Sequence, residues 1–378
     1  MWLGMSRIPS DGIMTELTTS RDLGIPCSDN IVDVSVIDST ARICVPMGFF
    51  VQNPMIGHEK LECPAFVILI QHPQGKKVLF DLGLRKDTAS FPPTIRDGPS
   101  FSPMAAEKDV AEILKEDGRV TFDECDSIIW SHWHPDHTGD PSKFLSNVEL
   151  VVGPGAKDFL LPGYPADPHG LILESDYAGR QLREVDFATG LQIGGLRAVD
   201  YFDDGSFYLL DAPGHAIGHM CALARTTAST FVFLGADSCH HAGSLRPNQY
   251  VPLPTAISPS PFSVPPYMEN TVCSRTLLEA IHPEHSCTVP YYSKLAPAPD
   301  RDVSTAETTI KKTISFDASD DVFVILAHDQ SLLSVIDFFP ETVNQWKEKG
   351  WKNRTRWRFL EDFKEAVARR SPSTLVTA

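Results

Sequence analysis

The segment SHWHPDHTGD, at residues 131–140, places three histidines and two aspartates directly after the apolar run SIIW. In extended backbone the side chains of His132 and His134 point to the same side, because side chains alternate with period two. That pair can therefore bind one metal ion. Asp136 and His137 are adjacent and must project in different directions, so a carboxylate and an imidazole are available for a second ion. This density of donors favours two metal sites over a polar turn whose histidines bond only to the backbone.

Metal sites need more donors than one loop supplies, and further donors follow apolar runs elsewhere in the chain. They are His215 and His219 after the run 207–211, Asp237 at the end of the run 230–237, and His328 at the end of the run 322–328. Active sites of layered α/β proteins tend to be assembled where strands end. We therefore expect these side chains to join those of residues 131–140.

The elements that must position these donors are mostly strands. Short runs rich in Val, Ile, Leu and Phe, bounded by turn residues, predict strands at 31–38, 65–71, 77–83, 127–130, 148–153, 207–211, 220–226, 230–237 and 322–328. Apolar residues at helical spacing predict a helix at 104–117 and a helical C-terminal end at about 341–370. Strands with intervening helices indicate a layered α/β fold.

The segment from about 242 to 300 differs in composition from the rest of the chain, because it holds eleven of the 30 prolines. Regular elements cannot run far there. The segment also carries more aromatic residues than a solvated linker, which favours a packed insertion near the active site over an inert surface loop. We expect Tyr267, Phe262 and Tyr292 to line the substrate site. The expected organisation is one domain over 1–378, with a core at about 30–240 and 305–340, this insertion, and the helical end.

Composition limits the possible partners. The 378 residues are 42% hydrophobic and 22% charged, as in a globular protein with a sizeable core. The formal charge of −16 disfavours nucleic acid and anionic membranes. The basic stretch from Lys347 to Arg370 is interpreted as a solvated helical face.

No stretch approaches the roughly 18 to 20 apolar residues of a membrane span, so a cytoplasmic protein is expected. The eight cysteines lack a CxxC pair, which indicates reduced thiols.

These residues resemble the motifs of the metallo-β-lactamase superfamily. The resemblance rests on His-x-His-x-Asp-His at 132–137, the Gly-His of PGHAIGH, the strand-terminal Asp237 and His328, and Asp81 in FDLG, which occur in the order of that family over residues 65–328. It implies an αββα sandwich with two metals at one edge of two sheets.

The resemblance also implies a role for each of these side chains. His132, His134 and His215 would hold the first metal, Asp136, His137 and His328 the second, and Asp237 would bridge them. His219 would form structural hydrogen bonds, and Asp81 would orient a ligand. Zinc is the first expectation for two divalent ions with such donors, although iron, manganese or cobalt also fit.

The expected chemistry is hydrolysis. Two such ions about 3.5 to 4 Å apart lower the pKa of a shared water towards about 7, which makes hydroxide available as a nucleophile. The metals would polarise the carbonyl and stabilise the leaving alkoxide, while Asp136 or Asp237 passes the proton. The substrate is expected to be a lactone or related ester of a small apolar molecule, and the sequence does not reveal an oligomeric state.

The motif surroundings are most similar to those of N-acyl homoserine lactonases. These enzymes usually carry a tyrosine three residues after the bridging aspartate, and this chain has His240 there. An imidazole N–H can donate the same hydrogen bond to a substrate carbonyl, so His240 is a candidate catalytic residue, with an incidental position or a different substrate as alternatives. Thioester and lactam hydrolysis remain open, whereas a phosphodiesterase, a mononuclear iron dioxygenase and a non-catalytic metal-binding module are disfavoured.

Overall fold

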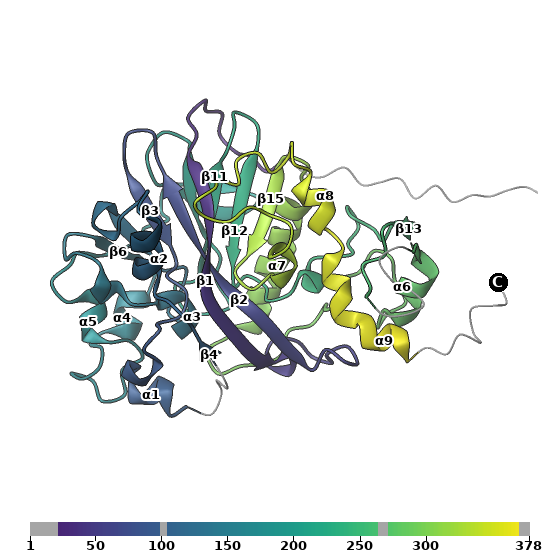
Figure 1. Cartoon of the computed structure of the whole chain (residues 1–378), viewed down its shortest axis with the longest axis horizontal. Helices are drawn as coiled ribbons and strands as arrows, with labels where there is room; N and C mark the ends of the chain where they lie inside the picture. Colours follow the sequence, from purple (N-terminus) through teal and green to yellow (C-terminus); the bar gives the residue numbers. More distant parts are fainter. Residues whose placement is uncertain (1–21, 99–103, 264–270, 370–378) are drawn as a thin grey trace, which may run out of the picture.

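The computed structural model describes residues 22–98, 104–263 and 271–369. Two sheets form its centre (Figure 1). The first has the order β4 (Met104–Ala105), β1 (Asp33–Pro46), β2 (Lys60–Gln71), β3 (Lys77–Phe80), β5 (Ser127–Ile129), β6 (Glu149–Val152) and β7 (Leu182–Glu184). The second has the order β15 (Val322–Leu326), β12 (Phe231–Ala236), β11 (Met220–Arg225), β10 (Phe207–Asp211), β9 (Leu196–Asp200) and β8 (Gln192–Ile193). A separate pair joins β13 (Ala256–Ile257) to β14 (Cys273–Ser274).

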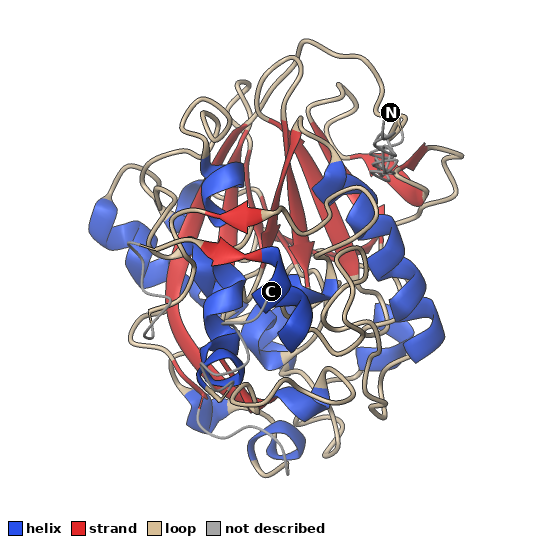
Figure 2. Cartoon of the chain, turned by 90° about the vertical axis from the view of Figure 1, so that its right-hand side faces the viewer, coloured by secondary structure: helices blue, strands red, loops and turns tan. Residues whose placement is uncertain are grey.

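Nine α-helices occur in the described residues, most of them short. They are α1 (Pro93–Arg96), α2 (Val110–Asp117), α3 (Pro135–Thr138), α4 (Ala156–Leu160), α5 (Glu174–Tyr177), α6 (Arg275–Ile281), α7 (Val303–Ala318), α8 (Trp351–Thr355) and α9 (Lys364–Ala368). In Figure 2 the strands occupy the middle of the molecule and helices lie to either side. Within the described ranges, no helix combines the length and apolar character needed to cross a bilayer.

The two sheets bury one apolar layer between them and one on each outer face. The inner layer joins residues such as Val36 and Ile68 of the first sheet to Leu209 and Ile325 of the second. The neighbouring residues of the same strands face outward. Those of the first sheet pack with α2, and those of the second pack with α7. Because both faces of each sheet are covered, the strands are apolar on nearly every residue. The fold is thus the expected αββα sandwich.

Each of the nine predicted strands overlaps a strand of the structure, but β1 continues to Pro46, and β7, β8 and β9 were not predicted. Two helical segments also differ from expectation. Residues 104–105 form β4 against β1, and α2 begins only at Val110, after Asp109 donates its backbone N–H to the Glu112 side chain. At the C-terminal end, residues 341–350 form turns, and short helical pieces begin at Trp351. Gly350 has a φ of 67°, a conformation that favours glycine and interrupts a helix.

Helix α7 was not predicted. Its sequence VSTAETTIKKTISFDA is rich in β-branched residues, which lower helix propensity. The Asp302 side chain caps its first turn by accepting the N–H of Thr305 at 3.1 Å. Ile310 and Phe316 then pack against the second sheet. Tertiary packing therefore stabilises this helix more than its local sequence does.

The described parts of the Pro-rich segment 242–300 pack against β1 and against residues 359–367. Its residues Leu253 and Leu277 share an apolar cluster with Val45 at the far end of β1 and with Phe359 and Phe363 near the C-terminus. Figure 1 shows α9 beside the part that carries α6 and β13. The segment is therefore held by a core of its own beside the sandwich.

Candidate metal centre

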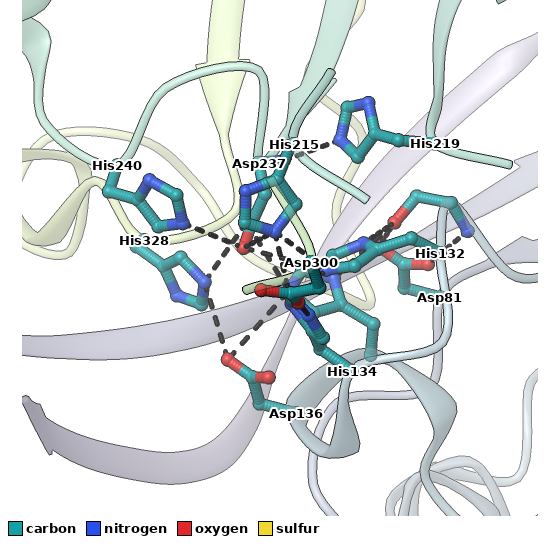
Figure 3. Close-up of polar contacts among 12 residues, drawn as sticks. Asp81, His132, His134, Asp136, His215, His219, Asp237, His240, Asp300 and His328 are labelled. Atoms are coloured by element: carbon teal, nitrogen blue, oxygen red, sulfur yellow. Dashed lines mark hydrogen bonds and ion pairs between the residues drawn. The ribbon is translucent and has the colours of Figure 1, made fainter. Parts of the chain in front are cut away.

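The metal-binding candidates converge at one edge of the two sheets, each from a segment that follows a strand (Figure 3). Loops after β5, β10, β12 and β15 supply them, and α3 carries Asp136 and His137. Two groups form, one of His132, His134, His215 and Asp237 and the other of Asp136, His137 and His328, with donor atoms within 4.8 Å of one another in each group. All seven predicted ligands are thus brought together.

Three imidazole nitrogens meet in the first group. Nε2 of His132 lies 2.8 Å from Nδ1 of His134, and Nε2 of His215 lies 3.2 and 3.0 Å from the same two atoms. Pro135 begins a one-turn helix directly after His134, so the chain turns before it reaches Asp136. Because of this turn, His132 and His134 join the first group, whereas Asp136 and His137 join the second.

Asp237 lies between the two groups and presents one carboxylate oxygen to each. Oδ2 is 3.4 Å from Nε2 of His215 and 3.7 Å from Nε2 of His132. Oδ1 is 3.3 Å from Nε2 of His137 and 3.0 Å from Nε2 of His328. A carboxylate in this position is suited to bridging two cations.

Hydrogen bonds at the far ring nitrogens fix how the histidines face the centre. Nδ1 of His137 lies 2.8 Å from Asp81, whose other oxygen accepts the Ser131 N–H at 2.7 Å. Nδ1 of His328 lies 2.7 Å from the Pro64 carbonyl, so this nitrogen must carry the proton and Nε2 is left to face the centre. Asp81 therefore orients His137 as expected. Such partners fix the tautomer and increase the basicity of metal ligands.

Sequence reasoning missed Asp300, which belongs to the same set of contacts. Its Oδ2 lies 2.7 Å from Nε2 of His134, which leaves Nδ1 of that ring to face the centre. No spacing or strand end marked this residue, because it follows Pro299 in the irregular segment. A single acidic residue near a proline carries no sequence signal for this role.

His219 does not join either group. Its Nδ1 donates to the Ala212 carbonyl at 2.8 Å, and its Nε2 accepts the backbone N–H of Asp237 at 3.2 Å. The ring therefore holds the turn around His215 against the strand end that carries Asp237, which is the structural role expected for it.

His240 faces the centre from the residues that follow β12. Its Nε2 lies 3.0 Å from Oδ2 of Asp237, and its ring stacks on Phe50 with the centroids 3.8 Å apart. Burial lowers the pKa of His240 to about 4, against the opposing effect of Asp237. The imidazole is therefore neutral at pH 7 and retains one N–H donor.

The charge balance of this buried centre calls for cations. Burial raises the pKa of Asp237, but His328 and His137 overcome it, so that this pKa lies well below its usual value. Burial lowers the pKa of His132 and His215 well below the usual value, and neighbouring histidines add to the effect. Burial lowers the pKa of His137 and His328, but Asp237 overcomes it and holds both pKa values well above the usual value. A buried carboxylate of this kind needs positive charge nearby, which divalent ions would supply.

Unsatisfied polar atoms support the same conclusion. Among the described residues, Oδ1 of Asp237 and Nε2 of both His137 and His240 are buried and lie 3.0 to 3.3 Å from a charged or polar neighbour in this centre, but none of these contacts is a hydrogen bond. Buried polar atoms normally have one, and imidazole and carboxylate donors of this kind suit divalent transition-metal ions. The residues present therefore fit two ions of this type.

A third group of possible donors, formed by His58, His241 and Asp362, has a structural explanation instead. Nδ1 of His241 accepts the N–H of Gly243 at 3.0 Å, so its proton lies on Nε2, 3.1 Å from Asp362. That ring has no lone pair left for a metal ion. Nδ1 of His58 bonds to the Tyr292 hydroxyl at 2.7 Å. The group ties three chain segments together.

Comparison with known proteins identifies the family. Residues 61–225 match the Metallo-beta-lactamase superfamily. The chain is 42% identical over 367 residues to the metallo-hydrolase mfmC of Annulohypoxylon moriforme, with 94% of each chain covered. The protein belongs to the metallo-β-lactamase superfamily. It is also 40% identical to the gamma-lactamase FDB1 of Fusarium pseudograminearum, with 94% of this chain and 89% of the relative covered.

The fold comparison agrees with that membership. The structure of an N-acyl homoserine lactone hydrolase, with the product N-hexanoyl-L-homoserine bound at its catalytic metal center, superposes with a TM-score of 0.53 at 16% identity. It covers 83% of this chain and 99% of that one. The metallo-β-lactamase fold of this chain is thus clear, and the relatives support a metal-dependent hydrolase.

Two of the three aromatic residues expected at the substrate site of this metallo-β-lactamase member lie elsewhere. Phe262 is 1% exposed in the apolar cluster beside the sandwich, and Tyr292 is 4% exposed and engaged by His58. Tyr267 lies outside the described residues. For Phe262 and Tyr292 the expectation failed. The composition of a segment indicates that it packs, but it does not identify the residues against which it packs. The Pro-rich segment does reach the centre, through Asp300 rather than through its aromatic residues.

Proposed function

We propose that this protein is a two-metal hydrolase that opens a lactone or a related ester of a small molecule. The two ions would be held by His132, His134 and His215, by Asp136, His137 and His328, and by Asp237 between them. The observation that carries the proposal is the orientation of Asp237, whose two oxygens face different sets of histidines at 3.0 to 3.7 Å. Zinc is the first candidate for both positions, given the imidazole and carboxylate donors.

When bound, such ions lower the pKa of a shared water towards about 7 and polarise a carbonyl oxygen. The protein's own residues orient the groups and move the proton. The side chain of Asp136 is 13% exposed, whereas that of Asp237 is 3% exposed. Asp136 is therefore better placed to contact a substrate. In this proposal Asp237 fixes the centre, and Asp136 carries the proton to the departing oxygen.

His240 would position the substrate. Its neutral imidazole lies beside Asp237 and is held by stacking on Phe50. A donated N–H would hold the substrate carbonyl and strengthen as charge develops on that oxygen. This role corresponds to that of the tyrosine found at this position in the lactonases that the motif resembles.

Opening of a γ-lactam is the second candidate. It is favoured by the relative FDB1, a gamma-lactamase that is 40% identical to this chain. The same arrangement serves both reactions, because each begins with attack on a carbonyl carbon. The departing amine of a lactam needs a proton more than an alkoxide does, so Asp136 would matter more for the lactam.

Metal analysis of the purified protein, combined with Asp237→Ala, tests the two-metal centre. We expect about two ions per chain in the wild type, and for the variant a lower ratio with at least a 100-fold loss of hydrolysis. His241→Gln is the matched control, because its ring is engaged by Gly243 and Asp362. A metal ratio near zero in the wild type, or near-wild-type hydrolysis by Asp237→Ala, refutes the proposal.

A substrate screen decides which bond is cleaved. Lactones, γ-lactams, thioesters and phosphodiesters of similar size are compared by kcat/KM with the metal-loaded protein. The proposal expects lactones to be preferred, and a preference for γ-lactams supports the second candidate. Turnover confined to thioesters or phosphodiesters contradicts both.

A further inference from the structure

A cavity of about 530 Å³ lies directly beside the candidate metal centre. It shares two residues with the surroundings of that centre. In the sequence, Trp133 lies between the metal-binding candidates His132 and His134. Its ring centroid is 4.6 Å from that of His134. Asp300 bonds to the same histidine. Two other cavities, of about 600 and 660 Å³, are lined by neither Trp133 nor Asp300, the two residues that place this cavity next to His134. Position therefore distinguishes the cavity at Trp133 from those two.

One wall of this cavity is apolar and partly open to solvent. Trp133, Phe159, Leu171 and Ile217 line it. The rings of Trp133 and Phe159 have centroids 5.6 Å apart. Phe159 is 41% exposed and Ile217 is 42% exposed, both high for large apolar side chains. Adjacent exposed apolar side chains beside a reactive centre are typical of ligand sites, because a bound apolar group removes them from water.

Arg301 supplies the polar side of the cavity. Its Nη1 donates to the carbonyls of Phe49 and Ala296 at 2.8 and 2.9 Å, which fixes the guanidinium between two loops. Nε and Nη2 have no hydrogen-bond partner in the part of the chain that the structure describes. Two donors of a fixed guanidinium thus remain available.

The charges around this arginine indicate what it can bind. Asp300 and Asp302 line the same cavity, so an anionic ligand would meet two carboxylates as well as the guanidinium. The overall charge of −16 adds to that repulsion. An uncharged oxygen, such as a carbonyl, ether or hydroxyl oxygen, can accept from Arg301 without this penalty.

We propose that this cavity binds the part of the substrate that is not cleaved, and that Arg301 donates hydrogen bonds from Nε and Nη2 to an uncharged oxygen on an apolar group there. Arg301 is a specificity-determining residue in this proposal. The substrate class is therefore a neutral lactone or lactam that bears an apolar substituent with a hydrogen-bond acceptor. This assignment rests on the proposed function for the reaction, but the binding step can be tested separately.

The test uses two substituted lactones that differ only in the acceptor oxygen on the apolar substituent, together with Arg301→Met. For the oxygen-bearing lactone we expect kcat/KM to fall by about 10-fold or more, as for the loss of a charge-assisted hydrogen bond. For the lactone without that oxygen, the variant should remain within about threefold of the wild type. An equal loss on both lactones overturns the role of Arg301.

Controls separate this role from a change in the loops that Arg301 holds. Arg354→Met removes an arginine that lines the cavity of about 600 Å³ and should leave both rates unchanged. Metal content and thermal unfolding of Arg301→Met are measured alongside, and Arg301→Lys should recover part of the preference. Phe159→Ala tests the apolar wall and should raise KM more for long substituents than for short ones. A uniform change across chain lengths overturns the assignment of that wall.

A binding measurement keeps this inference distinct from the proposed reaction. Cyclic ether analogues of the two lactones, which cannot be hydrolysed, are titrated calorimetrically into the metal-loaded protein. Tighter binding of the oxygen-bearing analogue, lost in Arg301→Met, supports the cavity assignment even if no lactone is turned over. Hydrolysis of lactones without any such difference in binding supports the reaction and overturns the inference.

Discussion

Asp300 lies 2.7 Å from Nε2 of His134, although 166 residues separate the two in the chain. The contact makes the end of the Pro-rich segment part of the candidate metal centre. It leaves Nδ1 of His134 to meet Nε2 of His132 and Nε2 of His215. The segment is thus more than a covering loop, because it sets the orientation of a metal-binding candidate.

Replacement of Asp300 tests this orientation. Asp300→Ala removes the acceptor, so we expect a 10- to 100-fold loss in affinity for the metal near His134, as is typical when such a partner is lost. Affinity is measured by competition with a chelator. Asp302→Ala is the matched control, because Asp302 lies two residues away and caps α7 through Thr305. Equal affinities for wild type and Asp300→Ala would contradict the assigned role.

Replacement of His240 separates substrate positioning from metal binding. His240→Phe keeps a ring that can stack on Phe50 but removes the N–H, so kcat/KM for lactones should fall by about 10- to 100-fold with metal content unchanged. His240→Tyr restores a donor and should recover part of the rate. If His240→Phe instead loses metal, the residue is a ligand and not a positioning group.

His58 should make stability depend on pH. Burial, with a contribution from His241, lowers its pKa to about 4 from the ordinary 6.5. The unfolded chain therefore binds more protons between about pH 4 and 6.5, and the free energy of unfolding rises with pH in that window, by at most about 1.4 kcal/mol per unit. His58→Gln should show a shallower slope in urea unfolding. The exposed His169→Gln should keep the wild-type slope, and identical slopes for all three proteins would contradict the prediction.

The ion pair between Arg246 and Asp317 should be important for stability. The two side chains are 7% and 2% exposed, and two hydrogen bonds of 2.8 and 2.5 Å join them. Arg246→Met leaves a buried carboxylate without its partner, which should cost about 3–5 kcal/mol in the free energy of unfolding. The exposed pair of Arg42 and Asp38 provides the control, with less than about 1 kcal/mol expected for Arg42→Met. Similar losses in the two variants would show that burial does not decide the effect.

Much of the fold follows from local patterns. Runs such as 207–211 and 322–328 are apolar on nearly every residue because both faces of each sheet are covered. The first run forms β10, and the first five residues of the second form β15. Helix α7 could not be predicted in the same way. Its β-branched sequence disfavours a helix, and packing of Ile310 and Phe316 on the second sheet outweighs that preference.

The sequence by itself determined which donors could meet. His132, His134, Asp136 and His137 lie within six residues, and His215, Asp237 and His328 each follow a strand, so the topology brings them to one edge. Only the tertiary structure decided what surrounds them. Asp300 and Arg301 lie in an irregular segment and contact His134 and Phe49, which are distant in the sequence, and no local pattern encodes such long-range contacts. Local periodicity therefore predicts the metal centre, whereas the site beside it exists only through contacts between distant segments.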